Sequence, residues 1–243
     1  MRSGTRPLML ISGWGAPVSM IEPWVDGSTY DVTSVSLDTS SVGPSANVDE
    51  LADRLMEGRD DRPLLVGWSL GGLVAMAMAR RAPDRIRGVI TVASTPCFVA
   101  RDDWPTAMPP DTFDRFRQGL AQNASRQWRR FLGLMVHGLA DDKAARQSLR
   151  PWLDAGPQTD DVTLGQTLEW LADTDQRDDW ANPAVSTRHL FGERDALVPP
   201  ACASAFGGNG GQVIRSMAHW PTGPALSQVV QEIEEFDHEH ARQ

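Results

Sequence analysis

The pattern best suited to chemistry in this sequence is Gly67-x-Ser69-x-Gly71, which follows a short apolar run and precedes a helix-forming run. In a nucleophile elbow of this kind, a serine sits on a strained turn between strand and helix, and its hydroxyl projects from the top of a sheet. The glycines keep the strand and helix from colliding with the bent chain. The spacing predicts Ser69 as the nucleophile of an acyl-transfer reaction, against the alternative of a glycine-rich turn that merely contains a serine.

A serine nucleophile needs a general base, and the base needs a carboxylate that orients it. On a fold with this elbow, the chain order is serine, acid, histidine. Of the five histidines, only His219 is expected in a loop between the last strand and the last helix. The acid should follow the preceding strand, where Asp195 is favoured because apolar residues and two prolines fix the turn after it; Glu193 is the alternative. We expect Asp195 to orient His219, and His219 to accept the Ser69 proton.

Backbone amides must stabilise the negative charge of the tetrahedral intermediate in such a reaction. One should be the amide of Leu70, which follows the nucleophile at a helix N-terminus whose dipole favours an anion. The other is expected from the loop after the first strand, which indicates Trp14. The Trp14 ring is itself a candidate for ordinary packing over the pocket.

Short apolar or β-branched runs that alternate with helical patterns must position these residues. The alternation predicts an α/β fold with a parallel sheet and helices on both faces. The strands are expected at 8–11, 31–37, 63–66, 86–93, 187–192 and 212–216. The accompanying helices are expected at 18–25, 47–56, 73–81, 200–206 and 223–238, with a loop at 38–46.

The strand pattern stops after residue 97 and resumes near residue 184. Helical spacing recurs between these points, at 111–121, 124–138, 141–153 and 162–173. The segment 97–183 is therefore predicted to be an inserted helical lid. The α/β core is predicted to comprise residues 1–96 together with 184–243.

Composition limits the possible functions. The 243 residues suit one α/β domain, and the net charge of −9 argues against nucleic acid as a partner. No apolar run approaches the roughly 20 residues of a membrane span, and the N-terminal run is too short for a signal peptide, so no membrane contact and a cytoplasmic location are expected. Cys97 and Cys202 are expected to be free thiols. Neither a metal-ligand spacing nor a dinucleotide fingerprint is found, which predicts no metal and no cofactor.

Two longer stretches resemble a known family. They are residues 67–75, Gly-Trp-Ser-Leu-Gly-Gly-Leu-Val-Ala, and residues 92–105, Val-Ala-Ser-Thr-Pro-Cys-Phe-Val-Ala-Arg-Asp-Asp-Trp-Pro. Both closely resemble the pimeloyl-[acyl-carrier protein] methyl ester carboxylesterases of biotin synthesis, and the similarity extends from about residue 8 to the end. The resemblance implies an α/β-hydrolase fold with a helical lid. About six strands are expected instead of the usual eight, because the sequence before Leu8 is too short for the family's N-terminal hairpin.

The resemblance also implies a reaction and a partner. Members of that family hydrolyse the methyl ester of pimeloyl-acyl carrier protein by a Ser-His-Asp mechanism, which releases methanol. Their lid arginines hold the acidic carrier protein. The corresponding residues here are Arg126, Arg130, Arg146 and Arg150, with Phe131 beside them.

The charge of the lid segment agrees with that implication. Residues 115–150 hold eight basic and two acidic side chains, a net charge of +6 in an acidic chain, which suits docking of an acidic partner. Each arginine pair is spaced i, i+4, so each is expected on one face of a helix. A solvated helix face is the alternative.

Other functions fit parts of the sequence. A broader carboxylesterase for short acyl or aryl esters would share the catalytic residues and differ in the lid. A non-enzymatic binding protein on the same fold is disfavoured, because no catalytic residue is missing. Two departures from the family pattern bear on the pocket, Ser12 in place of a histidine and Trp220 in place of a smaller residue. A monomer is expected.

Overall fold

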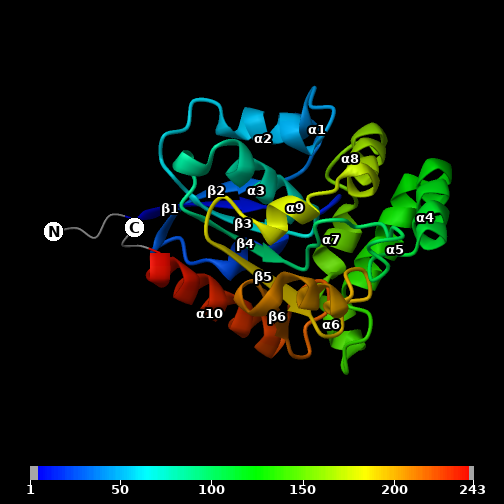
Figure 1. Cartoon of the computed structure of the whole chain (residues 1–243). Helices are drawn as coiled ribbons and strands as arrows, with labels where there is room; N and C mark the ends of the chain where they lie inside the picture. The colour runs from blue at the N-terminus through cyan, green and yellow to red at the C-terminus, as the bar shows by residue number, and fades with distance from the viewer. Residues whose placement is uncertain (1–4, 241–243) are drawn as a thin grey trace.

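Six strands pair side by side in a single parallel sheet (Figure 1). The computed structural model describes residues 5–240, apart from the side chains of residues 142 and 207–209. The strand order is β2-β1-β3-β4-β5-β6. The bounds are β1 (Arg6–Ile11), β2 (Tyr30–Val35), β3 (Leu64–Trp68), β4 (Gly88–Val92), β5 (Thr187–Gly192) and β6 (Gly211–Ile214). The predicted α/β fold with about six parallel strands is confirmed, and each neighbouring pair is parallel.

The strand register brings the predicted site residues to one edge of the sheet. Ile11 at the end of β1 pairs with Gly67 near the end of β3, and Val92 of β4 pairs with Leu190 of β5. The strands run in the same direction, so the loops that follow β1, β3, β5 and β6 leave from the same side. We call this side the carboxyl edge, and it is where parallel sheets bind ligands.

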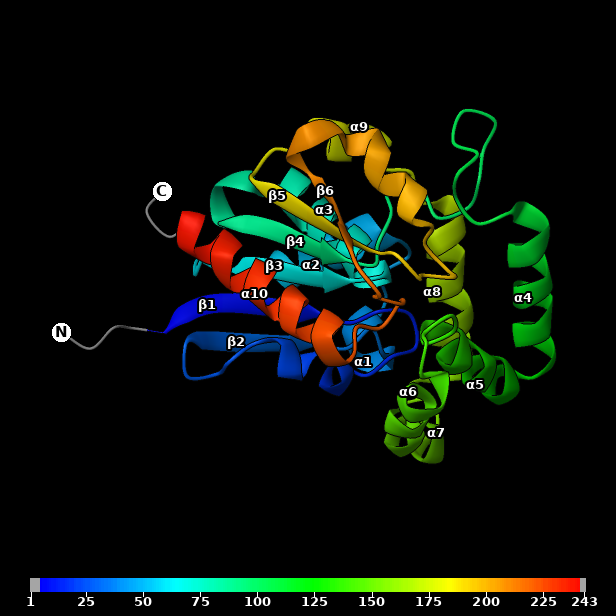
Figure 2. The same ribbon diagram turned by 90° about the horizontal axis from the view of Figure 1, so that it is seen from below.

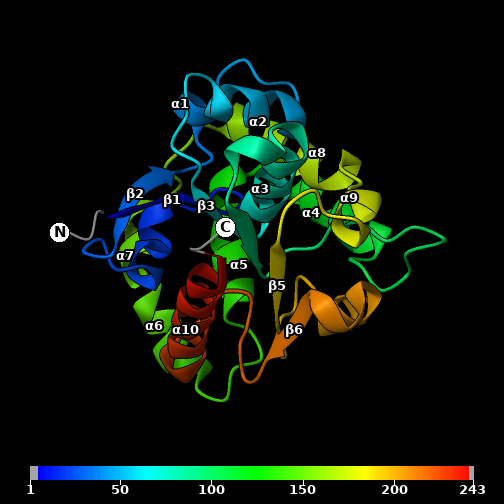
Figure 3. The ribbon, with the colours of Figure 1, turned by 60° about the vertical axis from the view of Figure 1, so that its left-hand side comes forward.

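Helices cover both faces of the sheet (Figures 1 and 3). One face carries α1 (Thr39–Val42), α2 (Val48–Met56), α3 (Leu70–Arg81) and α9 (Arg177–Ala181). The other carries α10 (Gly223–His240), which contacts the short 3-10 helix η2 (Glu22–Trp24) after η1 (Val18–Met20). The helix predicted at 47–56 begins as expected, because the Asn47 side chain accepts a hydrogen bond from the Glu50 amide at 2.9 Å.

The helices α4 to α8 lie beyond the carboxyl edge (Figure 2). Their bounds are α4 (Pro110–Gln122), α5 (Ala124–Met135), α6 (Asp142–Ser148), α7 (Arg150–Ala155) and α8 (Asp161–Asp173). We call them the lid helices. Between β4 and β5 the described chain forms only isolated bridges and no strand, in line with the predicted helical insertion. The exact lid bounds of 97 and 183 stay a prediction.

Several local predictions differ from the structure. The segment 141–153 is two helices rather than one, because Pro151 has no amide hydrogen to donate to the carbonyl four residues earlier. Arg146 and Arg150 therefore lie on α6 and α7, so the expectation that they share one helix face is wrong. Segments 18–25 and 200–206 form 3-10 turns, the second within η4 (Pro200–Asn209). The loop predicted at 38–46 contains α1, and α9 was not predicted.

Indole N–H groups fasten the lid helices to the core. Trp14 donates to the Leu164 carbonyl of α8 at 2.9 Å, and Trp128 of α5 donates to the Gly15 carbonyl at 2.6 Å. Trp170 of α8 donates to the Ala46 carbonyl at 2.9 Å. The lid is thus held against the loops that surround the carboxyl edge. No helix within residues 5–240 is both long and apolar enough to cross a bilayer.

Candidate active site

Ser69 lies in a strained turn between β3 and α3. Its φ of 54° is in the left-handed region, where a non-glycine residue is uncommon. A Cβ at Gly67 would lie 2.3 Å from the Gly71 carbonyl oxygen, and one at Gly71 would lie 2.3 Å from the Ile11 carbonyl oxygen. Both glycines are therefore required for the close approach of β1, β3 and α3, as the elbow pattern predicts.

Ser69, His219 and Asp195 form a continuous hydrogen-bonded series. His219 Nε2 is 3.0 Å from Ser69 Oγ, and His219 Nδ1 is 2.9 Å from Asp195 Oδ2. With Nδ1–H donating to the carboxylate, Nε2 is free to accept the serine hydroxyl. His219 is fully buried, whereas Ser69 and Asp195 are each 7% exposed. Proton transfer from Ser69 to His219 can therefore occur along a bond that is already formed.

The alternative acid, Glu193, lies elsewhere. Its carboxylate accepts a hydrogen bond from the Ser216 amide at 2.9 Å and is exposed. That backbone hydrogen bond lowers the pKa of Glu193. In contrast, Asp195 Oδ1 accepts the amides of Leu197 and Val198 at 2.8 and 2.9 Å, which leaves Oδ2 directed at His219. The structure brings Asp195, and not Glu193, to the imidazole.

The His219 loop is held from three sides. Trp68 Nε1, from the elbow strand, donates to the His219 carbonyl at 2.8 Å, and the two rings lie 5.8 Å apart. The Trp220 amide donates to the Met135 carbonyl at the end of α5 at 3.0 Å, and its indole donates to the Met20 carbonyl at 3.1 Å. Trp220, one of the two departures from the family pattern, thus anchors the loop to both lid and core.

The amides of Trp14 and Leu70 lie in the two loops that meet at Ser69. A Cβ at Gly13 would lie 3.0 Å from the Ser69 Cβ, so the chain just before Trp14 is in contact with the serine. Within residues 5–240, neither amide donates to another group. Both remain available to an oxyanion. Ser12 supports this loop because its hydroxyl accepts the Leu37 amide at 3.2 Å.

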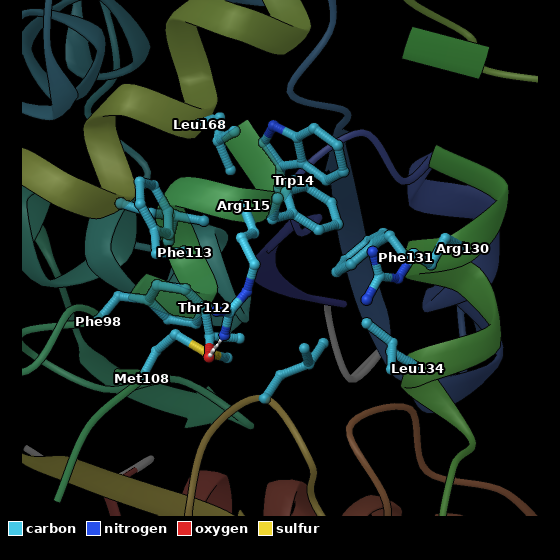
Figure 4. A pocket seen from close by; sticks show the side chains of 13 residues that line it. Trp14, Phe98, Met108, Thr112, Phe113, Arg115, Arg130, Phe131, Leu134 and Leu168 are labelled. Carbon is cyan, nitrogen blue, oxygen red and sulfur yellow. Dashed lines mark hydrogen bonds between the residues drawn. The ribbon is translucent and has the colours of Figure 1, made fainter. Parts of the chain in front are cut away.

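A cavity of about 190 Å³ lies between this site and the lid helices (Figure 4). Trp14 and Leu197 line it from the core. Phe131 of α5 is buried, and its ring lies 6.3 Å from the His219 ring and 5.0 Å from the Trp14 ring. The remaining lining is mainly apolar and includes Phe98, Met108, Phe113, Phe116, Leu134 and Leu168. Such a cavity suits a hydrophobic acyl chain.

The four lid arginines are all exposed, and they lie on three different helices. Arg126 and Arg130 share α5, and only Arg130 lines the cavity. Arg146 is exposed on α6, and Arg150 pairs with Asp154 of its own helix at 3.6 Å.

Sequence reasoning missed two polar residues of the cavity wall, Thr112 and Arg115 of α4. The signal was the spacing of Thr112, Arg115 and Phe116, which puts them on one side of a helix. The spacing alone does not show which way this side of α4 faces; the packing of Phe116 at the cavity does. No group of three or more potential His, Cys, Asp or Glu metal ligands lies within the described part of the chain.

A serine that is hydrogen-bonded to a histidine, which is itself hydrogen-bonded to an aspartate, defines a class of enzyme when it lies at the carboxyl edge of a parallel sheet. The chain belongs to the α/β hydrolase family, whose family model matches residues 8–232, and it is a carboxylic ester hydrolase. The solved structures that resemble it include an esterase from Exiguobacterium antarcticum, with a TM-score of 0.79, 17% identity, and 96% and 92% of the two chains covered. A bromoperoxidase from Bacillus anthracis has a TM-score of 0.78 at 20% identity, with 99% and 93% covered. These two likenesses show the fold.

Two curated relatives are more specific. The chain is 32% identical to the pimeloyl-[acyl-carrier protein] methyl ester esterase of Shewanella woodyi over 79% of this chain and 77% of that one. It is 30% identical to the biotin biosynthesis bifunctional protein BioHC of Cellvibrio japonicus over 96% of this chain. It spans about half of that longer protein, 48% of its length.

Proposed function

We propose that this enzyme hydrolyses the methyl ester of pimeloyl-acyl carrier protein, giving pimeloyl-acyl carrier protein and methanol in biotin biosynthesis. The observation that carries the proposal is the hydrogen-bonded series Ser69–His219–Asp195, which lies beside an apolar cavity. The names of the two curated relatives support the choice of ester. A neutral methyl ester on an aliphatic chain matches the apolar lining.

The first half of the reaction forms an acyl-enzyme. Ser69 Oγ attacks the ester carbon while His219 Nε2 takes the hydroxyl proton, and Asp195 stabilises the resulting imidazolium. The amides of Trp14 and Leu70 hold the oxyanion of the tetrahedral intermediate. The C–O bond to the methoxy group then breaks, and His219 returns its proton to the departing oxygen. Methanol leaves, and the acyl chain remains on Ser69.

The second half regenerates the enzyme. Water takes the place of methanol, and His219 Nε2 accepts one of its protons as the water oxygen attacks the acyl carbon. A second tetrahedral intermediate uses the same two amides. Its collapse returns the proton to Ser69 Oγ and releases the new carboxylic acid, which then loses its remaining proton to solvent to become the carboxylate. No group outside Ser69, His219, Asp195 and the two amides is needed.

The lid arginines are proposed to hold the carrier protein. Arg126 and Arg130 are exposed on α5, and Arg146 and Arg150 are exposed on the next two helices. An acidic carrier would be steered toward this basic surface although the enzyme as a whole is acidic. Phe131 follows Arg130 along α5 and lines the cavity, so one helix links the proposed docking surface to the acyl site.

The direct test is mass spectrometry of pimeloyl-acyl carrier protein methyl ester after incubation with the enzyme. We expect the loss of one methyl group from the carrier-bound chain, with the thioester intact, and no loss with Ser69→Ala. The same gene should restore growth without biotin to a strain that lacks this esterase. A wild-type enzyme that expresses well, leaves the carrier-bound ester unchanged and fails to rescue growth would contradict the proposal.

The second candidate is a broader carboxylesterase for short acyl or aryl esters. It is favoured by the lining of the cavity, whose apolar side chains do not by themselves select one chain length. The discriminating measurement is kcat/KM for the carrier-bound methyl ester against the same ester without the carrier. A higher value with the carrier supports the first function, and equal values support the second.

A further inference from the structure

Arg115 and Arg130 differ from most arginines of this protein. Core arginines are bound to carboxylates; Arg6 and Arg87, for example, both pair with the buried Asp237. Within residues 5–240, Arg115 has one side-chain hydrogen bond, from Nη2 to Thr112 Oγ1 at 3.2 Å, and Arg130 has none. Neither has a carboxylate partner there. Arg126 and Arg129 also have no carboxylate partner among the described residues, but Arg115 and Arg130 are distinguished from them because they line the acyl cavity.

Both guanidinium groups adjoin the acyl cavity from different helices. Arg115 extends from α4 toward Thr112, and Arg130 reaches from α5 toward the middle of the cavity (Figure 4). Nearly all the other lining is aromatic or aliphatic. Both arginines are also exposed to solvent, so they mark the open side of the cavity. An uncompensated guanidinium at an apolar wall is a suitable partner for a carboxylate or phosphate, which it binds in a bidentate manner.

We propose that Arg115, with Arg130 opposite, binds an anionic group that the substrate carries away from the scissile ester. The inference rests on the proposed function and adds a specificity-determining residue to it. The apolar part of the acyl chain lies in the cavity, with its neutral methyl ester directed past Phe131 and Trp14 toward Ser69. The charged part stays with the arginines at the open side.

The anion has two possible sources with the same chemistry. In the carrier-bound substrate it is the phosphate of the prosthetic arm, because the other end of that acyl chain is a thioester. In a free half-ester it is the carboxylate at the other end of the chain. In both cases the charge fixes which end of the substrate enters, because a charged end is held outside while the neutral ester passes the aromatic wall. Arg115 then acts on substrate orientation and leaves the proton transfers to His219.

The test compares charged and neutral esters in matched pairs. The first pair is monomethyl pimelate and dimethyl pimelate. The second is the thioester of monomethyl pimelate with 4′-phosphopantetheine and the same thioester with pantetheine, which lacks the phosphate. For each pair, the ratio of kcat/KM for the charged ester to that for the neutral ester is measured with wild type, Arg115→Gln and Arg115→Lys.

We expect Arg115→Gln to lower this ratio about tenfold in at least one pair, since a charge-assisted hydrogen bond is lost, and Arg115→Lys to restore part of it. The matched control is Arg117→Gln. Arg117 is on the same helix and its loss changes the net charge equally, but it pairs with Asp114 and Glu169 outside the cavity. The ratio should not change in this control.

Each outcome has one meaning. If Arg115→Gln lowers the kcat/KM ratio for the first pair alone, the anion is a carboxylate. If it lowers the ratio for the second pair alone, the anion is a phosphate. Ratios that Arg115→Gln leaves unchanged, or that Arg117→Gln lowers equally, overturn the inference while the esterase stands. If wild type cleaves the small esters but not the carrier-bound methyl ester, the proposed function fails, and the ratios still test Arg115.

Discussion

At the carboxyl edge, the side chains proposed for chemistry are buried and hydrogen-bonded to one another. The lid, in contrast, carries exposed arginines, several of which have no carboxylate partner in the part of the chain that the structure describes. His219 uses both ring nitrogens, and Asp195 uses both oxygens. Arg126 is exposed on α5; its amide donates to Asn123 Oδ1 at 2.8 Å, and its guanidinium has no partner within residues 5–240. The groups proposed to react are therefore ordered before substrate arrives, and the exposed lid groups are accessible to a partner. Turnover and recognition are thus assigned to different parts of the molecule.

The largest effect is expected at the carboxyl edge. Ser69→Ala and His219→Ala should lower kcat by roughly 10⁴ to 10⁶, and Asp195→Asn by about 10⁴, because these residues act as a unit. The loss should be the same for carrier-bound and free methyl esters. Steady-state kinetics with both esters measures it, and circular dichroism establishes that each variant is folded.

Glu193→Gln is the matched control for the acid. Glu193 is exposed and bonded to the Ser216 amide, so its loss should change kcat little. If Asp195→Asn kept wild-type activity while Glu193→Gln lost it, the acid would have to be reassigned.

The core also contains a buried histidine without a role in the proposed reaction. His189 stacks on Trp180 with ring centroids 4.1 Å apart, and its Nδ1 lies 2.8 Å from Thr91 Oγ1. Its other nitrogen has no partner within the described residues. Burial lowers the pKa of His189 from 6.5 to about 3. A neutral imidazole is thus required for the native core.

This histidine predicts loss of stability in acid. Below pH 6.5 the unfolded chain binds a proton at His189 that the folded chain does not accept until about pH 3, so the free energy of unfolding falls across that window. The contribution should be roughly 3 kcal/mol at pH 4.5. Urea unfolding between pH 7 and 4.5 measures it, with His189→Phe as the non-titrating variant. The prediction is wrong if both proteins show the same dependence on pH, since the carboxylates titrate in both.

The lid should behave in the opposite way to the carboxyl edge. Arg126→Glu is expected to lower kcat/KM for the carrier-bound ester about tenfold at low salt, with a smaller loss at high salt, because exposed charges act mainly on association and are screened. Its effect on the free methyl ester should be much smaller. Kinetics at two ionic strengths with both esters tests this.

The control for charge reversal is Arg62→Glu. Arg62 is exposed just before β3, at the end of the sheet away from the lid, and its reversal changes the net charge by the same amount. An equal fall in kcat/KM for Arg62→Glu would mean that overall charge, not the lid surface, governs association. The separation of recognition from turnover would then fail for the carrier.

The sequence predicted the carboxyl edge more fully than the lid, for physical reasons. The elbow glycines, the order of Ser69, Asp195 and His219, and the short apolar strands are local signals, and the parallel sheet brings them together. The choice of Asp195 over Glu193 agrees with the geometry, because the apolar turn after Asp195 directs two amides to its other oxygen.

The lid depends on contacts that local patterns do not contain. That Arg115 lines the cavity depends on how α4 packs across it from α5. The break between α6 and α7 did have a local signal in Pro151. The prediction of one helix over residues 141–153 relied on helical periodicity alone and did not take this proline into account. The indole bonds that join lid and core connect residues 113 to 150 positions apart, and no spacing rule finds them.

The smallest effect is expected at Trp68, which belongs to the carboxyl edge but takes no part in proton transfer. Its indole donates to the His219 carbonyl at 2.8 Å and so positions the loop that carries the base. Trp68→Phe keeps an aromatic ring and removes this bond. We expect kcat to fall several-fold, equally for carrier-bound and free esters, with a shift in the pH profile of kcat/KM as the imidazole loses its fixed orientation.

Trp24→Phe is the matched control for this loss. Trp24 is a buried neighbour whose ring lies 6.1 Å from that of Trp68, and its indole makes no hydrogen bond within residues 5–240. It loses the same volume as Trp68→Phe but no contact to His219. If both variants lower kcat equally without moving the pH profile, Trp68 contributes only packing. If Trp68→Phe instead lowers turnover of the carrier-bound ester alone, the effect must pass through Trp220 and Met135 to α5, and recognition and turnover are coupled.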